Sequence, residues 1–363
     1  LRDGGGQTHL IKIIEYLKKE RNFSVSILVS QNSDLSFERD DIEIVKISLP
    51  LENQIIRTLW EIFYLPLLIK KLNVNLLFCP GGVLLTRIPK HVKSATMFRN
   101  MTPFEVDQVK RMPFGLIKIR NLILKKLMKT SIAKADLVIF ISKFAEEIMK
   151  KNLKRPLMRS TLIPHGVDFA KHAGSEDISH VFKYPYMVYP SSVDVYKSQL
   201  EVVEAYALAS KKSKLPYLVF VGSLEQNKKY TALLKDKIKA HNLEKKVILA
   251  GKVNYQLMPS IYKQSEFVIF ASQSENCPNI LLEAMSSRKF ILCSDIQPMP
   301  EFAKNTVLYF DPRNPQDLAF KILYSLDNKE VQLKLSSKSF EESRHYSWEK
   351  TADATWKFLN SAL

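Results

Sequence analysis

Several features that would mark a specialised class of protein are scarce in this chain. Its 363 residues include only 10 glycines and few low-complexity tracts, which argues against a linker-rich or disordered protein. There is no run of roughly 18 or more apolar residues, so a membrane-spanning helix is not expected, and no secretory signal is visible. The length and an apolar content of 46% instead indicate two domains with full hydrophobic cores.

Cysteine is also scarce. The three cysteines, Cys79, Cys277 and Cys293, match no metal-binding spacing, and their odd number suits a reducing cytosol. No cluster of metal ligands is evident elsewhere in the sequence. We therefore expect a cytoplasmic protein without a bound metal or cofactor.

Acidic residues are few relative to basic ones. The formal net charge is +17, and residues 51–160 alone hold 21 Lys and Arg against 7 Asp and Glu, an excess of 14. A basic half could attract nucleic acid, an anionic membrane surface or phosphorylated substrates. Because no RNA- or DNA-binding signature accompanies the charge, we do not expect a nucleic-acid partner.

Apolar runs alternate with helical patterns along the chain, which is typical of parallel sheets covered by helices. In the first part we expect strands at 25–29, 42–47, 75–78, 95–98 and 137–141, and helices at 8–19, 54–71 and 116–134. After a polar stretch at 172–180 we expect strands at 186–189, 217–222, 247–250, 267–270 and 290–293, and helices at 199–210, 230–241, 259–263, 279–287 and 315–325. A final helix is expected within 346–363. The pattern predicts an α/β protein.

Two carboxylates stand out in the segment 271–295. Glu275 lies in a polar loop after an expected strand, and Glu283 lies eight residues later on an expected helix. Open parallel sheets bind ligands at the carboxyl ends of their strands. Glu283 has apolar neighbours on both sides, and because an unpaired buried carboxylate is costly, we expect it to have a hydrogen-bonding partner. The alternative is an ordinary loop charge and a solvated helix charge.

The sequence of residues 274–284, SENCPNILLEA, resembles the donor-site signature S-E-x-x-P-N-x-x-L-E-A of family 4 retaining glycosyltransferases, which have the GT-B fold. The resemblance implies two Rossmann-like domains facing a cleft. Residues 1–170 would form the acceptor-side domain and residues 181–345 the nucleotide-sugar-binding domain. Residues 346–363 would form a helix that packs back on the first domain.

The resemblance also implies roles for the residues of this motif. Glu283 would bind the ribose hydroxyls of the donor, and Glu275 would face the transferred sugar and act in catalysis. Amides of the loop between them would contact the sugar or diphosphate, and the substrate-binding residues of this loop would be Asn276, Cys277, Pro278 and Asn279.

Lys197 matches a lysine that many relatives place at the donor diphosphate. A cation there can neutralise the leaving group, although a plain helix-start lysine is the alternative. The usual arginine partner is absent, and Ser191 and Ser192 occupy its region. Among the other strand ends of the second domain, the resemblance implies substrate contacts at Ser192, Gly222, Lys252 and Val253, the last two beside the nucleobase.

The first residues form a glycine-rich turn. Glycine allows close backbone approach, and free amides at a helix start attract anions, so the resemblance places Gly5 and Gly6 near the point of sugar transfer. A plain strand-to-helix turn is the alternative. The chain begins at Leu1 without Met and without a preceding strand. We therefore expect that its natural amino terminus is absent and that one sheet lacks a central strand.

Arg99 and Asn100 follow the strand expected at 95–98, where many family members have a His-Asp pair. Arg99 could bind a phosphate or carboxylate bidentately and is a candidate catalytic residue, with Asn100 as a substrate contact. A surface arginine beside a turn-forming Asn-x-x-Pro is equally open. Ile163–Asp168 resembles the family's hinge stretch, with His165 in place of the usual Asn.

The helix expected at 116–134 is basic and amphipathic. Leu116, Ile119, Ile123 and Leu127 share one face, which could lie on an anionic membrane or, alternatively, in the core. The concentration of charge in this half favours a peripheral protein on the inner face of the membrane.

Together these patterns predict a retaining glycosyltransferase that uses a GDP- or UDP-linked sugar and a lipid-linked or polysaccharide acceptor of a bacterial surface glycan. The alternatives are a non-catalytic nucleotide-sugar-binding homologue, and an epimerase or phosphorylase on the same fold.

Overall fold

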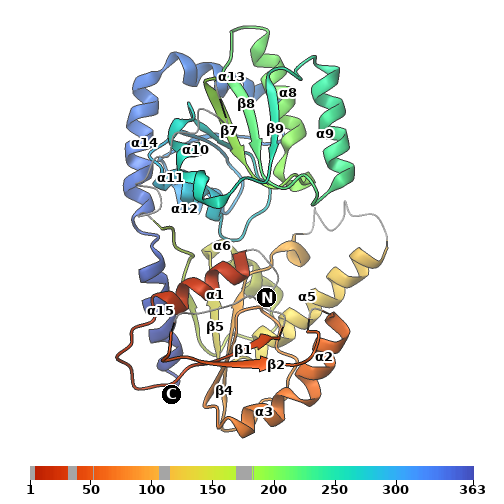
Figure 1. Ribbon diagram of the computed structural model, residues 1–363, viewed down its shortest axis with the longest axis vertical. Coiled ribbons are helices and arrows are strands. Elements are labelled where there is room, and N and C mark those ends of the chain that lie inside the picture. The colour runs from red at the N-terminus through yellow and green to blue at the C-terminus, as the bar shows by residue number, and fades with distance from the viewer. Residues whose placement is uncertain (1–4, 32–38, 52, 106–114, 169–181, 183) are drawn as a thin grey trace. The chain divides into compact units, whose positions relative to one another are not determined.

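The computed structural model describes residues 5–31, 39–51, 53–105, 115–168, 182 and 184–363. The chain divides into two compact units: unit 1 comprises residues 1–165 and 348–363, and unit 2 comprises residues 166–347. Each unit contains parallel strands covered by helices, which confirms the predicted α/β class (Figure 1). The polar stretch at 172–180 lies outside the described residues.

Unit 1 contains a two-stranded sheet, β1-β2, and a four-stranded sheet, β3-β4-β5-β6, both parallel. The strands are β1 (Ser26–Ser30), β2 (Glu43–Ile47), β3 (Leu76–Cys79), β4 (Lys93–Phe98), β5 (Leu137–Phe140) and β6 (Ser160–Leu162). The helices are α1 (Gly5–Glu15), α2 (Gln54–Phe63), α3 (Leu65–Lys71), the short 3-10 helix η1 (Thr102–Phe104), α5 (Leu116–Lys134), α6 (Lys143–Asn152) and α15 (Trp348–Asn360). β5 is buried along its whole length, which explains its unbroken apolar sequence. The expected absence of a central strand stays a prediction.

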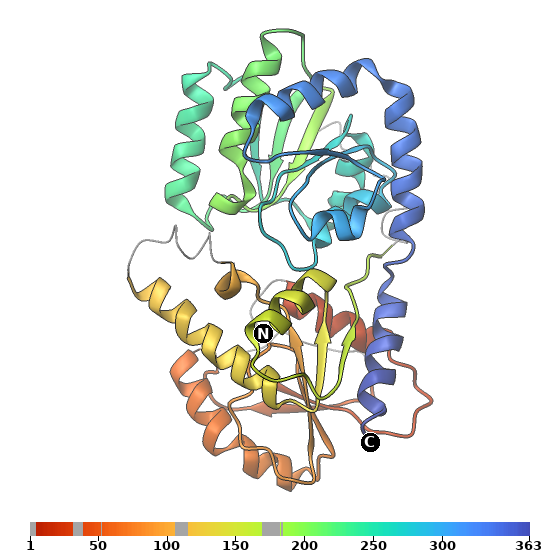
Figure 2. The same ribbon diagram turned by 180° about the vertical axis from the view of Figure 1, so that it is seen from behind.

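Unit 2 contains one parallel sheet of six strands in the order β12-β11-β10-β7-β8-β9. The strands are β7 (Tyr186–Pro190), β8 (Tyr217–Val221), β9 (Val247–Gly251), β10 (Val268–Phe270), β11 (Ile291–Ser294) and β12 (Leu308–Phe310). The helices are η2 (Val195–Lys197), α8 (Gln199–Ser210), α9 (Lys228–Ala240), η3 (Tyr255–Leu257), α10 (Met258–Gln264), α11 (Asn279–Ser286), α12 (Met299–Ala303), α13 (Pro315–Asp327) and α14 (Lys329–Ser343). They cover both faces of the sheet (Figure 2).

The strand order of unit 2 reverses between β7 and β10. From β7 the chain proceeds to β8 and β9 on one side, and it then returns to add β10, β11 and β12 on the other side. Val188 of β7 pairs with Val268 of β10 at this reversal. The carboxyl ends of two such strands border the crevice where open α/β sheets bind ligands.

Several element boundaries predicted from the sequence are wrong. α1 begins at Gly5 rather than Thr8, so Gly5 and Gly6 are helical rather than part of a loop. The single helix expected at 54–71 is broken at Tyr64, because Pro66 lies in the first turn of α3, where it lacks an amide donor and restricts the preceding residue. The elements that were not predicted are α6, β6, α12, β12, α14 and the short 3-10 helices η1, η2 and η3.

α15 packs against α1 within unit 1. The indole Nε1 of Trp356 donates a hydrogen bond to the carbonyl of Ile13 at 2.7 Å. Ala352 is fully buried in the same apolar cluster as Ile13 and Ile14. The last helix of the chain is therefore part of the core of the first unit.

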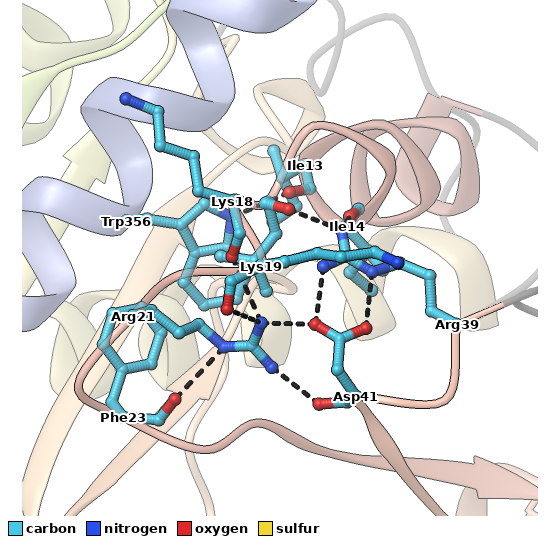
Figure 3. A network of polar contacts seen from close by, with 10 residues as sticks. Ile13, Ile14, Lys18, Lys19, Arg21, Phe23, Arg39, Asp41 and Trp356 are labelled. Carbon is cyan, nitrogen blue, oxygen red and sulfur yellow. Dashed lines mark hydrogen bonds and ion pairs between the residues drawn. The ribbon is translucent and has the colours of Figure 1, made fainter.

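A polar network joins the end of α1 to the segment before β2 (Figure 3). The guanidinium groups of Arg39 and Arg21 both donate to the carboxylate of Asp41, and Arg39 also donates to the carbonyl of Ile14 at 2.8 Å. Hydrogen bonds from Arg39 and Arg21 hold the pKa of the Asp41 carboxyl well below its usual range. The network therefore keeps its charge under mildly acidic conditions.

Candidate functional site

Lys197 and Glu275 form a direct ion pair at the switch point of unit 2. Lys197 ends the 3-10 helix η2 between β7 and α8, and Glu275 lies in the loop between β10 and α11. The ammonium of Lys197 donates to Oε1 of Glu275, and the two side chains are 7% and 17% exposed. Lys197, which the sequence assigned to the donor diphosphate, thus lies beside Glu275, which the sequence assigned to the transferred sugar.

The charge of Lys197 is stabilised by its surroundings. Burial alone would lower the pKa of Lys197, but attraction by Glu275, with smaller contributions from Tyr196 and Asp194, outweighs it, and the net pKa is raised. The ammonium also lies 4.9 Å from the ring centroid of Tyr196. An ammonium has three donors, so a cation paired with one carboxylate oxygen can still bind an anion.

Gln273 ties the two loops of this site together. Its amide N donates to the carbonyl of Tyr196 at 2.7 Å, and its Nε2 donates to Oγ of Ser198 at 2.7 Å. Arg313, which follows β12, donates to Oε1 of Gln273 at 3.4 Å. Sequence analysis missed Gln273 and Arg313. The sequence feature that could have pointed to them as site residues is their position close to the carboxyl end of a strand.

Glu283 has the hydrogen-bonding partners that its apolar neighbours predicted. The hydroxyl of Tyr255 donates to Oε1 at 2.6 Å, and the hydroxyl of Tyr262 donates to Oε2 at 3.2 Å. Burial and, secondarily, the charge of Glu283 raise the pKa of both tyrosines, so both hydroxyls stay protonated donors. Sequence analysis missed both tyrosines, although Tyr255 follows the predicted contact Val253 by two positions.

Gly222 allows the ends of β7 and β8 to approach each other. Its φ is +151°, and a Cβ placed on it would lie 2.1 Å from the carbonyl oxygen of Ser191. Its amide donates to the carbonyl of Gly251 at 2.8 Å, and the carbonyl of Ser192 accepts from Nε2 of Gln199 at 3.1 Å. Gly222 and Ser192 therefore shape the backbone at the carboxyl ends of β7 and β8.

The other predicted contacts of unit 2 lie at the carboxyl ends of β9 and β10. Lys252 is exposed and Val253 half-buried just after β9. Asn276, Cys277 and Pro278 are buried in the loop between β10 and α11, and Asn279 begins the helix. The first amides of a helix have no acceptor within the helix, so this loop can present donors to a ligand.

Four predicted site residues belong to unit 1. Gly5 and Gly6 form the start of α1, and Arg99 and Asn100 follow β4. Oδ1 of Asn100 accepts a hydrogen bond from the amide of Thr102 at 3.1 Å, which is the turn-forming role left open by the sequence. Arg99 is half-buried.

α1 of unit 1 carries a histidine that the sequence did not single out. His9 is fully buried, and its ring centroid lies 5.0 Å from that of His165 and 5.8 Å from that of Trp348. Burial lowers the pKa of His9, and the nearby positive charges of His165 and Arg99 lower it further. His165 also stacks on Trp348, with ring centroids 5.6 Å apart.

Among the residues that the structure describes, no group of three or more His, Cys, Asp or Glu side chains is arranged to hold a metal ion. No described helix combines the length and the apolar character needed to cross a membrane.

Comparison with known proteins identifies relatives over both units. A protein from Campylobacter jejuni, N-acetylgalactosamine-N,N'-diacetylbacillosaminyl-diphospho-undecaprenol 4-alpha-N-acetylgalactosaminyltransferase, is 27% identical over 303 residues, which cover 81% of this chain and 78% of that protein. The O-antigen chain mannosyltransferase B of Escherichia coli is 20% identical over 264 residues, which cover 71% of this chain and 69% of that protein.

Solved structures show the same fold. A glycosyltransferase from Rickettsia africae superposes with a TM-score of 0.75 at 19% identity, covering 100% of this chain and 96% of that one. Anabaena HepE, solved in complex with UDP, superposes with a TM-score of 0.71 at 16% identity, covering 99% of this chain and 97% of that one.

Two family descriptions match almost the whole chain between them. Residues 3–171 match Glycosyltransferase Family 4, and residues 160–342, half of the chain, match Glycosyl transferases group 1. The protein therefore belongs to the group 1 glycosyl transferases, with the two Rossmann-like domains of the GT-B fold.

Proposed function

We propose that the protein is a retaining, metal-independent hexosyltransferase that uses a GDP- or UDP-linked sugar. The acceptor is a lipid-linked or polysaccharide glycan of a bacterial cell surface. The observation that carries this proposal is the ion pair of Lys197 and Glu275 at the switch point of unit 2. The activities for which the Campylobacter and Escherichia relatives are named support the class of acceptor.

The donor nucleotide is held through its ribose and diphosphate. The carboxylate of Glu283 accepts hydrogen bonds from Tyr255 and Tyr262, and the ribose hydroxyls of the donor would donate to the same carboxylate. Lys197 binds the diphosphate, assisted by amides at the start of α11. Lys252 and Val253 lie beside the base.

The reaction breaks the bond between the anomeric carbon and the diphosphate and forms a bond to an acceptor oxygen on the same face of the sugar. The acceptor proton passes to the departing phosphate oxygen, so no separate base is needed. Lys197 stabilises the negative charge that develops on the leaving group. Glu275 orients both the ammonium and the sugar, and Gly5, Gly6, Arg99 and Asn100 of unit 1 contribute contacts on the acceptor side.

The test combines nucleotide binding with product analysis. A thermal-shift panel of GDP, UDP, CDP and ADP identifies the base, because a ligand that binds only the folded state raises its stability. The matching nucleotide-sugar is then incubated with lipid-linked acceptors, and NMR of the product gives the anomeric configuration. We expect stabilisation by one nucleotide and a product that keeps the donor configuration.

Other outcomes favour the alternatives. Nucleotide binding without turnover indicates a non-catalytic homologue. Conversion of the donor without any acceptor indicates an epimerase. A product of opposite anomeric configuration contradicts the retaining mechanism.

A further inference from the structure

α2 and α3 expose a stripe of large apolar side chains. Ile55 is 73% exposed, Leu59 51%, Phe63 70% and Leu67 63%. Their spacing of four residues places them along one side of the helical path, which continues past the break at Tyr64. The residues of these helices that are buried in the core of unit 1 are Trp60, Leu65, Leu68 and Ile69. These helices are thus apolar both toward the core and toward solvent.

α5 extends the apolar surface. Ile119 is 43% exposed, Leu122 56% and Ile123 55%. Both ribbon views show α5 beside α2 on the same flank of unit 1 (Figures 1 and 2). Met128 and Ile132 pack in the core instead, so the interpretation of the Ile119 and Ile123 face as a core face is wrong.

The same helices are strongly basic. Over residues 54–71 and 116–134 there is one acidic residue, Glu61, which forms an ion pair with Arg57. The basic residues of these helices are Arg57, Lys70, Lys71, Lys118, Arg120, Lys125, Lys126, Lys129 and Lys134. The ion pairs found within the described residues include none of the α5 cations. Exposed apolar groups and unneutralised cations thus occupy one flank.

We propose that this flank of α2, α3 and α5 docks on an anionic lipid bilayer. The apolar stripe enters the boundary between headgroups and acyl chains, and the lysines and arginines bind anionic headgroups, which is the combination that holds amphipathic helices on membranes. A nucleic acid would match the cations but leave the apolar stripe in water. The proposal supplies a location for a lipid-linked acceptor, and in that sense it rests on the proposed function.

The test is flotation of the full chain with vesicles of phosphatidylcholine containing phosphatidylglycerol, compared with phosphatidylcholine alone. The combined substitutions Leu59→Ser, Phe63→Ser and Leu67→Ser are expected to reduce binding to the anionic vesicles by about tenfold or more. A matched control carries Leu233→Ser and Leu333→Ser, two side chains of unit 2 that are 55% and 70% exposed, and is expected to bind as the parent does.

A second variant tests the charge. Lys118→Gln with Lys126→Gln is expected to weaken binding by roughly fivefold for each cation, and added salt should weaken the parent in the same direction. Equal binding of the parent to both kinds of vesicle would contradict the role of the cations. Unchanged flotation of the stripe variant, which carries Leu59→Ser, Phe63→Ser and Leu67→Ser, would overturn the proposal. If the parent binds no vesicles but forms dimers, and the stripe variant is monomeric, the surface would instead bind a second copy of the chain.

The nucleotide panel keeps this test separate from the proposed function. The flank shares no residue with Lys197, Glu275 or Glu283, so the stripe variant should keep the thermal shift of the parent. Vesicle binding without any nucleotide response would overturn the donor site and leave the membrane surface standing. A nucleotide response without vesicle binding would overturn the membrane surface alone.

Discussion

Substitution of Glu283 by glutamine changes the charge of the donor site while keeping its shape. The carboxylate accepts from Tyr255 at 2.6 Å and from Tyr262 at 3.2 Å. Tyr262 is fully buried, so removal of this carboxylate acceptor in Glu283→Ala is expected to cost about 1–3 kcal/mol of folding stability. The variant Glu283→Gln retains an acceptor oxygen at this position, so we expect it to lose little folding stability.

The effect on binding follows from the loss of charge-assisted hydrogen bonds. Two ribose hydroxyls that donate to a carboxylate gain about 1 kcal/mol each over the same bonds to a neutral amide. The variant Glu283→Gln is therefore expected to bind the cognate nucleotide with about 2 kcal/mol less free energy, roughly a thirtyfold increase in Kd.

The assay is isothermal titration with the cognate nucleotide and with its 2'-deoxy analogue. Glu225→Gln is the control, because that carboxylate is 75% exposed and pairs only with a surface lysine in the described structure. The parent should lose affinity for the deoxy analogue, and Glu283→Gln should lose less. Binding by Glu283→Gln within about threefold of the parent, or an equal deoxy penalty in both proteins, would refute the ribose contact.

Three further predictions concern other parts of the molecule. Lys197→Met should lower kcat by about 10²–10³, with Lys197→Arg less affected, as measured by initial rates. Burial lowers the pKa of His9 in the folded protein, so below about pH 6.5 the unfolded chain binds a proton that the folded protein does not, and the free energy of unfolding should fall. Urea titrations of the parent and of His9→Phe at several pH values test this. An equal fall of the free energy of unfolding with pH in both proteins would contradict it. Gly222→Ala should lower Tm more than Gly251→Ala, because only the former Cβ meets the Ser191 carbonyl; equal losses would show that φ alone matters.

Sequence patterns predicted those elements whose local signals agree with the fold. The bounds of α5 (Leu116–Lys134) and α8 (Gln199–Ser210) match the prediction residue for residue, because each begins and ends where its helical pattern does. Glu275 and Glu283 could be placed on a loop and a helix because the strand, the Pro-Asn helix start and the apolar face are all local features.

Contacts between distant positions could not be predicted in the same way. Lys197 and Glu275 are 78 positions apart, and only the strand order, with β7 beside β10, brings them together. Tyr262 lies on a short helix whose sequence gives no reason to expect a carboxylate partner. The break at Tyr64 was missed because the helical spacing of apolar residues continues across it. Pro66 breaks the helix through its backbone, where it lacks an N–H, and the hydrophobic pattern does not reveal this.

A crystal structure of the protein with bound UDP or GDP tests the donor site most directly. We predict that the ribose hydroxyls lie within hydrogen-bonding distance of the Glu283 carboxylate and that the diphosphate contacts the Lys197 ammonium at the β7–β10 switch point. A nucleotide bound elsewhere, or one whose diphosphate lies away from Lys197, would contradict the proposed site.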